Sequence, residues 1–257
     1  MIFDIVTIFP DLLASPLQEG IIRKARQEGK IDIRITNIRD FADDKHATTD
    51  DRPFGGGEGM VMKVEPLAAA VESARQQSSA ARVILLSPQG SRFDQQKAVQ
   101  LAGESHLILV CGRYEGVDER FRSCYVDEEL SIGDYILTGG ELAAMVVIDA
   151  VTRLLDGVLG CRGSVENDTF SRQLLKHPQY TRPQRWKDME VPAELLSGNH
   201  EEISNYRFLL SVRQTLNRRP DLLRLVQFSA AEQKLLRRHG LFAAVQKALA
   251  DQAGGQA

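Results

Sequence analysis

The chain has 257 residues, of which 43% are hydrophobic and 26% are charged, which is the composition of an ordinary globular protein with room for one large or two modest domains. It contains no run of eighteen apolar residues and no basic segment at its start, so neither a membrane span nor a secretion signal is expected. The cysteines Cys111, Cys124 and Cys161 lack zinc spacing, which favours free thiols and a cytoplasmic location.

The net charge of -3 is unevenly distributed along the sequence. From residue 160 onward there are 15 Lys and Arg residues against 10 Asp and Glu, whereas the first 159 residues carry 17 against 25. A basic C-terminal part is typical of a segment that meets a polyanion, although a solvated helical face is the simpler explanation for so modest an excess.

Predicted strands and helices alternate in the first 160 residues. Strands are expected where β-branched and aromatic residues cluster, at residues 2–8, 31–36, 82–86, 106–111 and, briefly, 125–126. Helices are expected where apolar residues recur at helical spacing, at residues 12–28, 64–78, 94–102, 117–124 and 142–155. The alternation predicts an α/β fold with a mainly parallel sheet.

Three loops that contain glycine follow strand-like segments, at residues 87–90, 112–116 and 131–140. Parallel α/β sheets bind ligands beyond the carboxyl ends of their strands, so these loops are expected to form one cleft. Glycines there would let a ligand approach the backbone closely. Neither GxGxxG nor GxxxxGK[ST] is present, which argues against an ordinary dinucleotide site and a P-loop, and the five histidines lack metal-ligand spacing.

The character of the sequence changes after Gly160. Residues 161–184 are polar and contain two prolines, so they are interpreted as an interdomain linker between domains at residues 1–160 and 185–257. The second domain is expected to be small and all-helical, with helices at residues 191–196, 199–216, 221–226 and 230–250. Ser229 and Glu232 predict a capping box before the last helix.

Several segments together resemble the TrmD family, the bacterial tRNA (guanine-N1)-methyltransferases of the SPOUT class. They are DRPFGGG from Asp51, LSPQG from Leu86, CGRYEGVDER from Cys111, SIGDYILTGGEL from Ser131 and PQYTRP from Pro178, with LSGNH from Leu196 and RRPDLL from Arg218. The resemblance runs from residue 1 to about the last helix.

The resemblance implies a SPOUT-type N-terminal domain with a deep trefoil knot. It implies methyl transfer from S-adenosylmethionine to N1 of the guanosine at tRNA position 37, beside the anticodon. The cofactor-binding residues that it implies lie in the three loops or, for Leu86, directly before the first: Leu86, Ser87, Pro88, Gly90, Gly112, Arg113, Tyr114, Glu115, Ser131, Ile132, Gly133, Tyr135, Ile136, Leu137, Gly139 and Gly140. A homodimer is also implied, in which the linker and the tRNA-binding helical domain of one subunit complete the cleft of the other.

The catalytic residues implied by the resemblance are Asp168 and Arg153. Asp168 would take the proton from guanine N1, and Arg153 would stabilise the negative charge that develops near O6. Taken alone, Asp168 is interpreted as a helix N-cap and Arg153 as a complement to a helix dipole. The resemblance also implies a possible Mg2+ dependence, which Glu115 would influence, although Glu115 and Arg113 taken alone are interpreted as a surface ion pair.

The linker departs from the family pattern at two positions. Gln173 stands where the family commonly has glycine, and Lys176 stands where it has aspartate. These changes leave open an RNA-binding protein that has lost catalysis. A SPOUT-class methyltransferase that acts on another RNA also remains open, because its cofactor loops would look the same.

Overall fold

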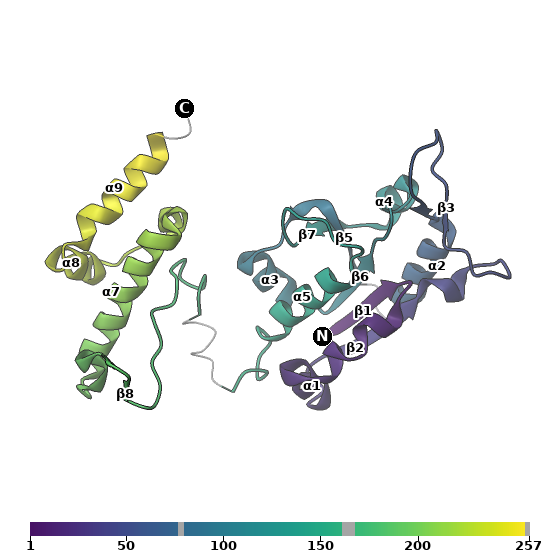
Figure 1. The fold of residues 1–257 in the computed structure, drawn as a ribbon. Coiled ribbons are helices and arrows are strands. Elements are labelled where there is room, and N and C mark those ends of the chain that lie inside the picture. The colour runs from purple at the N-terminus through teal and green to yellow at the C-terminus, as the bar shows by residue number, and fades with distance from the viewer. Residues whose placement is uncertain (77–79, 161–167, 255–257) are drawn as a thin grey trace. The chain divides into compact units, whose positions relative to one another are not determined.

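The computed structural model describes residues 1–76, 80–160 and 168–254 (Figure 1). The chain separates into two compact units, Met1–Gly160 and Cys161–Ala257.

The first unit is built around a five-stranded sheet in which every pair of neighbouring strands is parallel, with the order β2-β1-β6-β5-β7. The strands are β1 (Ile2–Thr7), β2 (Asp32–Asn37), β5 (Arg82–Arg92), β6 (His106–Cys111) and β7 (Glu128–Ser131). All six residues of β6 are buried, as expected for a central strand covered on both faces. The predicted α/β fold with a mainly parallel sheet is confirmed.

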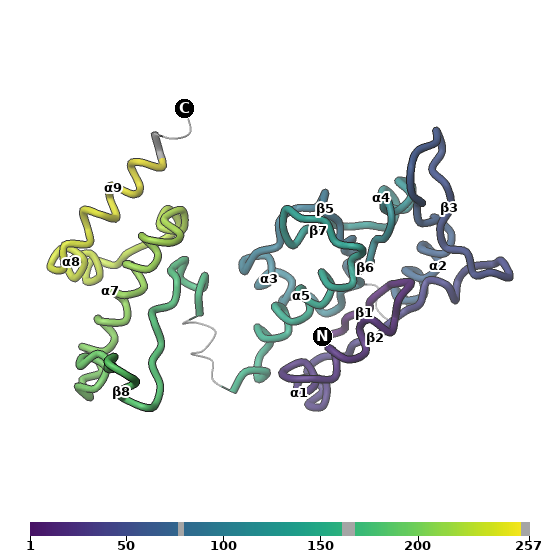
Figure 2. The backbone as a smooth tube through the Cα atoms, viewed as in Figure 1, coloured from purple at the N-terminus to yellow at the C-terminus, as the bar shows by residue number. Residues whose placement is uncertain are grey.

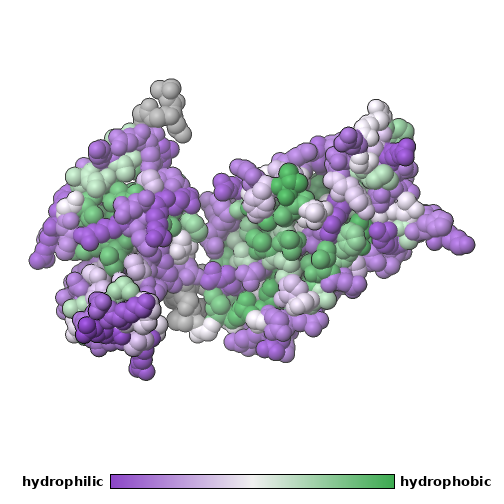
Figure 3. All heavy atoms as spheres, viewed as in Figure 1, coloured by the Kyte–Doolittle hydropathy of each residue, from purple (hydrophilic) through white to green (hydrophobic). Residues whose placement is uncertain are grey.

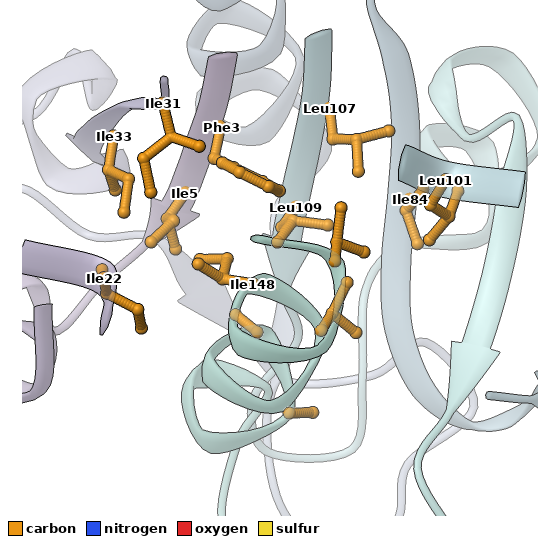
Figure 4. Close-up of a cluster of buried hydrophobic side chains, with 14 of the residues drawn as sticks. Phe3, Ile5, Ile22, Ile31, Ile33, Ile84, Leu101, Leu107, Leu109 and Ile148 are labelled. Atoms are coloured by element: carbon orange, nitrogen blue, oxygen red, sulfur yellow. The ribbon is translucent and has the colours of Figure 1, made fainter. Parts of the chain in front are cut away.

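Alternate side chains of the strands enter two hydrophobic cores, one on each face of the sheet. Phe3, Ile5 and Leu109 pack with Ile148 on one face (Figure 4). The helices of this face are α1 (Gly20–Gln27), α3 (Gln95–Ala102) and α5 (Glu141–Thr152). The other face is covered by α2 (Val64–Arg75) and α4 (Glu119–Tyr125).

Residues 37–58 contain a 3-10 helix, Ile38–Phe41, and the short strand β3 (Asp50–Asp51). β3 pairs with β4 (Val61–Met62) in an antiparallel ladder. The segment beside β3 extends away from the sheet as the dark blue tube in Figure 2.

Some predicted boundaries in the first unit are wrong. Residues 12–28 are not one helix, because Pro10 and Pro16 each begin a separate 3-10 helix and α1 starts only at Gly20. The short extended piece predicted at residues 125–126 lies further on, as β7. β5 continues through the predicted loop at 87–90, with a register shift against β7 between Leu86 and Ser91.

The second unit is mainly helical. Its elements are the 3-10 helices Ala193–Leu196 and Pro220–Leu225 and the α-helices α7 (His200–Arg218), α8 (Ala230–Arg238) and α9 (Leu241–Gly254). Leu209, Val212, Leu223 and Leu236 belong to its buried core.

Two features of the second unit differ from the prediction. The expected helix at 230–250 is broken into α8 and α9 at Gly240, whose φ of +71° does not continue a helix. A hairpin of β8 (Arg185–Trp186) and β9 (Met189–Glu190) occurs in the part expected to be all-helical. The capping box of Ser229 and Glu232 is confirmed.

Candidate functional site

A cleft of about 450 Å³ lies beside the middle of β5 and at the ends of β6 and β7, and the three predicted glycine loops line it. Nearly all of the expected cofactor-binding residues are among its walls: Leu86, Ser87, Pro88, Gly112, Arg113, Tyr114, Glu115, Ser131, Ile132, Gly133, Tyr135, Ile136, Leu137, Gly139 and Gly140. The structure therefore brings together segments that are far apart in the sequence.

Gly90 is the expected cofactor residue that does not line the cleft. A side chain at this position would overlap the backbone of Glu129 and Leu130 in β7. Glycine is needed here because it lets β5 approach β7 closely within the register shift.

Gly140 joins two walls of the cleft through the backbone. Its N–H donates to the carbonyl of Gly112 at 3.0 Å. A Cβ on Gly140 would lie 2.8 Å from Cys111 Cα and 3.2 Å from Gly112 N. The segment after β7 thus crosses the end of β6 at a separation that leaves no room for a side chain.

Arg113 is held in the cleft by a buried carboxylate. Its Nη2 lies 2.9 Å from Glu141 Oε2, and Glu141 is only 2% exposed. Thr7 Oγ1 donates to the other oxygen of Glu141 at 2.6 Å, and the Arg113 guanidinium lies 4.4 Å from the ring centroid of Phe9. The expected surface pair of Arg113 with Glu115 is not formed, because Glu141 at the start of α5 takes the guanidinium.

Glu115 connects the cleft to the glycine-rich loop before β4. The N–H of Glu115 donates to the carbonyl of Met60 at 2.9 Å. Its side chain lies so close to Gly59 that a Cβ there would be 2.6 Å from Glu115 Cγ. The loop at 55–59 therefore reaches the edge of the cleft.

Cys111 lies behind the cleft and is fully buried. Burial raises the pKa of its thiol well above the usual value, the carboxylate of Glu141 adds to this effect, and Arg113 opposes it. The thiol therefore stays protonated at neutral pH and serves as a packing group.

The sequence reasoning missed part of the lining. Gln89 and Thr138 lie inside the quoted motifs and could have been found there. Arg122, one turn after Glu119 in α4, lies 2.7 Å from Glu119 and 3.2 Å from Glu129, and all three line the cleft. The spacing of three residues between Glu119 and Arg122 in a predicted helix could have indicated their ion pair.

Arg153 lies outside this lining. It caps the C-terminus of α5, where its N–H donates to the carbonyls of Asp149 and Val151. This is the position where a cation complements the helix dipole, as one of the sequence interpretations proposes.

Asp168 belongs to the second unit and does not cap a helix, because residues 169–171 form a turn. Its Oδ1 lies 3.1 Å from Lys176 Nζ, and its side chain is 24% exposed. Gln173 has a φ of +57°, a conformation that suits the glycine expected there.

Within residues 1–76, 80–160 and 168–254, no three His, Cys, Asp or Glu side chains are arranged to hold a metal ion. In the same part of the chain, no helix is both long enough and apolar enough to cross a bilayer.

The chain matches the family model described as tRNA (Guanine-1)-methyltransferase TrmD over residues 1–225. A tRNA (guanine-N(1)-)-methyltransferase of Geobacter sulfurreducens is 55% identical over 236 residues, which are 92% of this chain and 96% of the relative. The protein of the same name from Geobacillus kaustophilus is 54% identical over 223 residues, 87% of this chain and 91% of the relative. That from Carboxydothermus hydrogenoformans is 52% identical over 242 residues, 94% of each chain.

Proposed function

The chain belongs to the tRNA (guanine-1)-methyltransferase TrmD family, and we propose that it transfers a methyl group from S-adenosylmethionine to N1 of the guanosine at position 37 of tRNA. The observation that carries this proposal is the single cleft formed by the three motif-bearing loops of the first unit. A tRNA substrate also favours a cytoplasmic location.

The residues of the cleft fit S-adenosylmethionine. The volume of the cleft, about 450 Å³, lies within the range of small-molecule sites, about 300–1,000 Å³. Leu86, Ile132 and Leu137 supply apolar surface for an adenine ring, and the backbone near Gly140 supplies polar groups at close range. When bound, S-adenosylmethionine supplies an electrophilic methyl carbon on a sulfonium.

The remaining chemistry requires a base, because guanine N1 carries a proton. We propose that the carboxylate of Asp168 takes this proton, which leaves the N1 lone pair free to act as the nucleophile toward the methyl donor. Arg153 would stabilise the negative charge near guanine O6. The Arg113 guanidinium, already paired with buried Glu141, would shape the pocket.

A homodimer would supply the base from a second subunit. The support for it is an exposed apolar row on α5, where Leu142 is 59% and Val146 45% exposed. Apolar side chains gather over α5 in Figure 3 as well, and a shallow groove runs between α1 and α5, with Ile21 and Met145 in its walls. Such a surface is typical of a subunit interface, and Arg153 follows it along the same helix.

The deep trefoil knot is likewise proposed from the family. Gly140 crosses Cys111 and Gly112 at backbone contact distance, and we propose that the chain is threaded near this crossing. For the helical unit we propose the anticodon branch of tRNA as partner, bound in a salt-sensitive way through its basic excess. A Mg2+ dependence, which Glu115 would influence, is likewise proposed from the family alone.

Methylation of defined tRNA transcripts tests the proposal. Transcripts with guanosine at positions 36 and 37 are expected to yield 1-methylguanosine at position 37, and transcripts with adenosine at 37 are expected to yield none. Equal methylation of both would favour a SPOUT-class enzyme for another RNA. If calorimetry shows no S-adenosylmethionine binding, the enzyme proposal fails and RNA binding without catalysis is favoured.

A further inference from the structure

Residues 168–176 form a turn whose two ends are joined by hydrogen bonds that involve side chains. Lys176 Nζ lies 3.1 Å from Asp168 Oδ1, and the Lys176 N–H donates to Thr169 Oγ1 at 3.2 Å. The N–H of Ser171 donates to the Asp168 carbonyl at 3.2 Å. Lys176 therefore contacts the Asp168 carboxylate through its side chain and the Thr169 hydroxyl through its backbone N–H.

The same turn is attached to the helices of its own unit. Leu174 is 6% exposed within the hydrophobic core, and the Leu175 N–H donates to Thr215 Oγ1 on α7 at 2.9 Å. Arg172 Nη2 lies 2.6 Å from Glu232 Oε1 near the start of α8. These contacts lie within one unit and fix the backbone of the turn, so a side chain on it can be held in a defined position.

The geometry points to Lys176 as a positioning residue that holds the Asp168 carboxylate ready to take the proton from guanine N1. This inference rests on the proposed function, in which Asp168 is the base. A charge-assisted hydrogen bond from an ammonium fixes one carboxylate oxygen and thereby the plane of the group. The two side chains are 38% and 24% exposed, so a substrate can reach the pair.

The competing explanation for Lys176 is a contact with an RNA phosphate. A phosphate contact affects the binding of tRNA and its salt dependence. Positioning of the base affects the rate of the chemical step. Loss of a phosphate contact should therefore raise KM for tRNA, whereas loss of positioning should lower kcat.

The test compares Lys176→Met, Lys176→Arg, Asp168→Asn and the double variant Asp168→Asn/Lys176→Met in single-turnover and steady-state methylation of tRNA. Lys176→Met is expected to lower kcat about tenfold while KM for tRNA stays within about twofold. Lys176→Arg should recover most of the rate, because its guanidinium can also donate to Asp168. In the Asp168→Asn background, Lys176→Met should change the rate less than about twofold.

Circular dichroism, melting curves and calorimetry with S-adenosylmethionine establish that each variant is folded and binds the cofactor. A higher KM with a smaller salt dependence and an unchanged kcat in Lys176→Met would assign Lys176 to a phosphate and overturn the inference. An equal loss of rate in both backgrounds would overturn it as well, because Lys176 would then act without Asp168. Full turnover by Asp168→Asn removes the proposed base and this inference with it, whereas an inactive wild type removes the proposed function itself.

Discussion

Replacing Gly140 by alanine is expected to damage stability and cofactor binding together. The new Cβ would lie 2.8 Å from Cys111 Cα and 3.2 Å from both Cys111 Cβ and Gly112 N. Carbon atoms in favourable contact lie about 3.5–4.0 Å apart, so the two segments must separate by roughly 1 Å. The contacted atoms belong to the end of buried β6 and cannot rotate away.

The cost can be estimated from two effects. Overpacking at a tight site costs about 1–3 kcal/mol. Separation of the segments also weakens the 3.0 Å hydrogen bond from the Gly140 N–H to the Gly112 carbonyl, which contributes about 1 kcal/mol. The free energy of unfolding of the first unit should therefore fall by about 2–4 kcal/mol.

Denaturant unfolding and calorimetry with S-adenosylmethionine measure the two effects. Because Gly140 and Gly112 both line the cleft, the Kd for the cofactor should rise at least about tenfold. Gly160→Ala is the matched control, since no atom lies within 4 Å of a Cβ there and its effect should be small. Wild-type stability and affinity in Gly140→Ala would refute the idea that backbone crossing forms the cleft.

Three further outcomes are expected. Asp168→Ala should lose most turnover and keep cofactor affinity, and calorimetry that shows weakened cofactor binding would contradict the proposal that Asp168 acts on the guanine proton and not on the cofactor. Burial alone would raise the pKa of Glu232, but hydrogen bonds from Arg172 and a backbone N–H outweigh it and lower that pKa. The Glu232 carboxylate therefore stabilises the fold at pH values above its unfolded-state pKa, and this effect is lost as the pH falls through its folded-state pKa. In urea unfolding, Glu232→Gln should lower the free energy of unfolding at pH 7 and should lower it less below about pH 4. Mass spectrometry after alkylation of native protein should find exposed Cys124 modified and buried Cys111 intact, and early modification of Cys111 would contradict its burial.

Four of the five strands of the sheet could be predicted because they are continuous apolar or alternating runs, whereas β7 begins with two glutamates and was expected at the wrong residues. Residues 106–111 are an example of such a run, and the structure buries all six. The hairpin of β8 and β9 could not be predicted, because its turn at Lys187 has a φ of +54° without glycine or asparagine to signal it. The prediction of a single helix at 12–28 was wrong because Pro10 and Pro16 each begin a separate 3-10 helix despite the apolar periodicity.

Within the site, the loops could be predicted but their cross-contacts could not. Glu141 receives a hydrogen bond from Thr7, which lies 134 positions earlier, and no sequence pattern indicates that pairing. The sequence predicts a cofactor contact for Gly90, whereas the structure requires glycine there for the approach of β5 to β7. The sequence shows Lys176 only as a departure from the family pattern, and the folded turn places it against Asp168.

The most direct test of a shared active site is a heterodimer of two impaired subunits. One subunit carries Gly140→Ala, which damages its cleft, and the other carries Asp168→Asn, which removes its base; different tags allow the mixed dimer to be purified. If the base acts across the interface, one intact site remains and tRNA methylation should reach about half of the wild-type rate. A mixed dimer as inactive as its two parents would contradict this account and place cleft and base in the same chain.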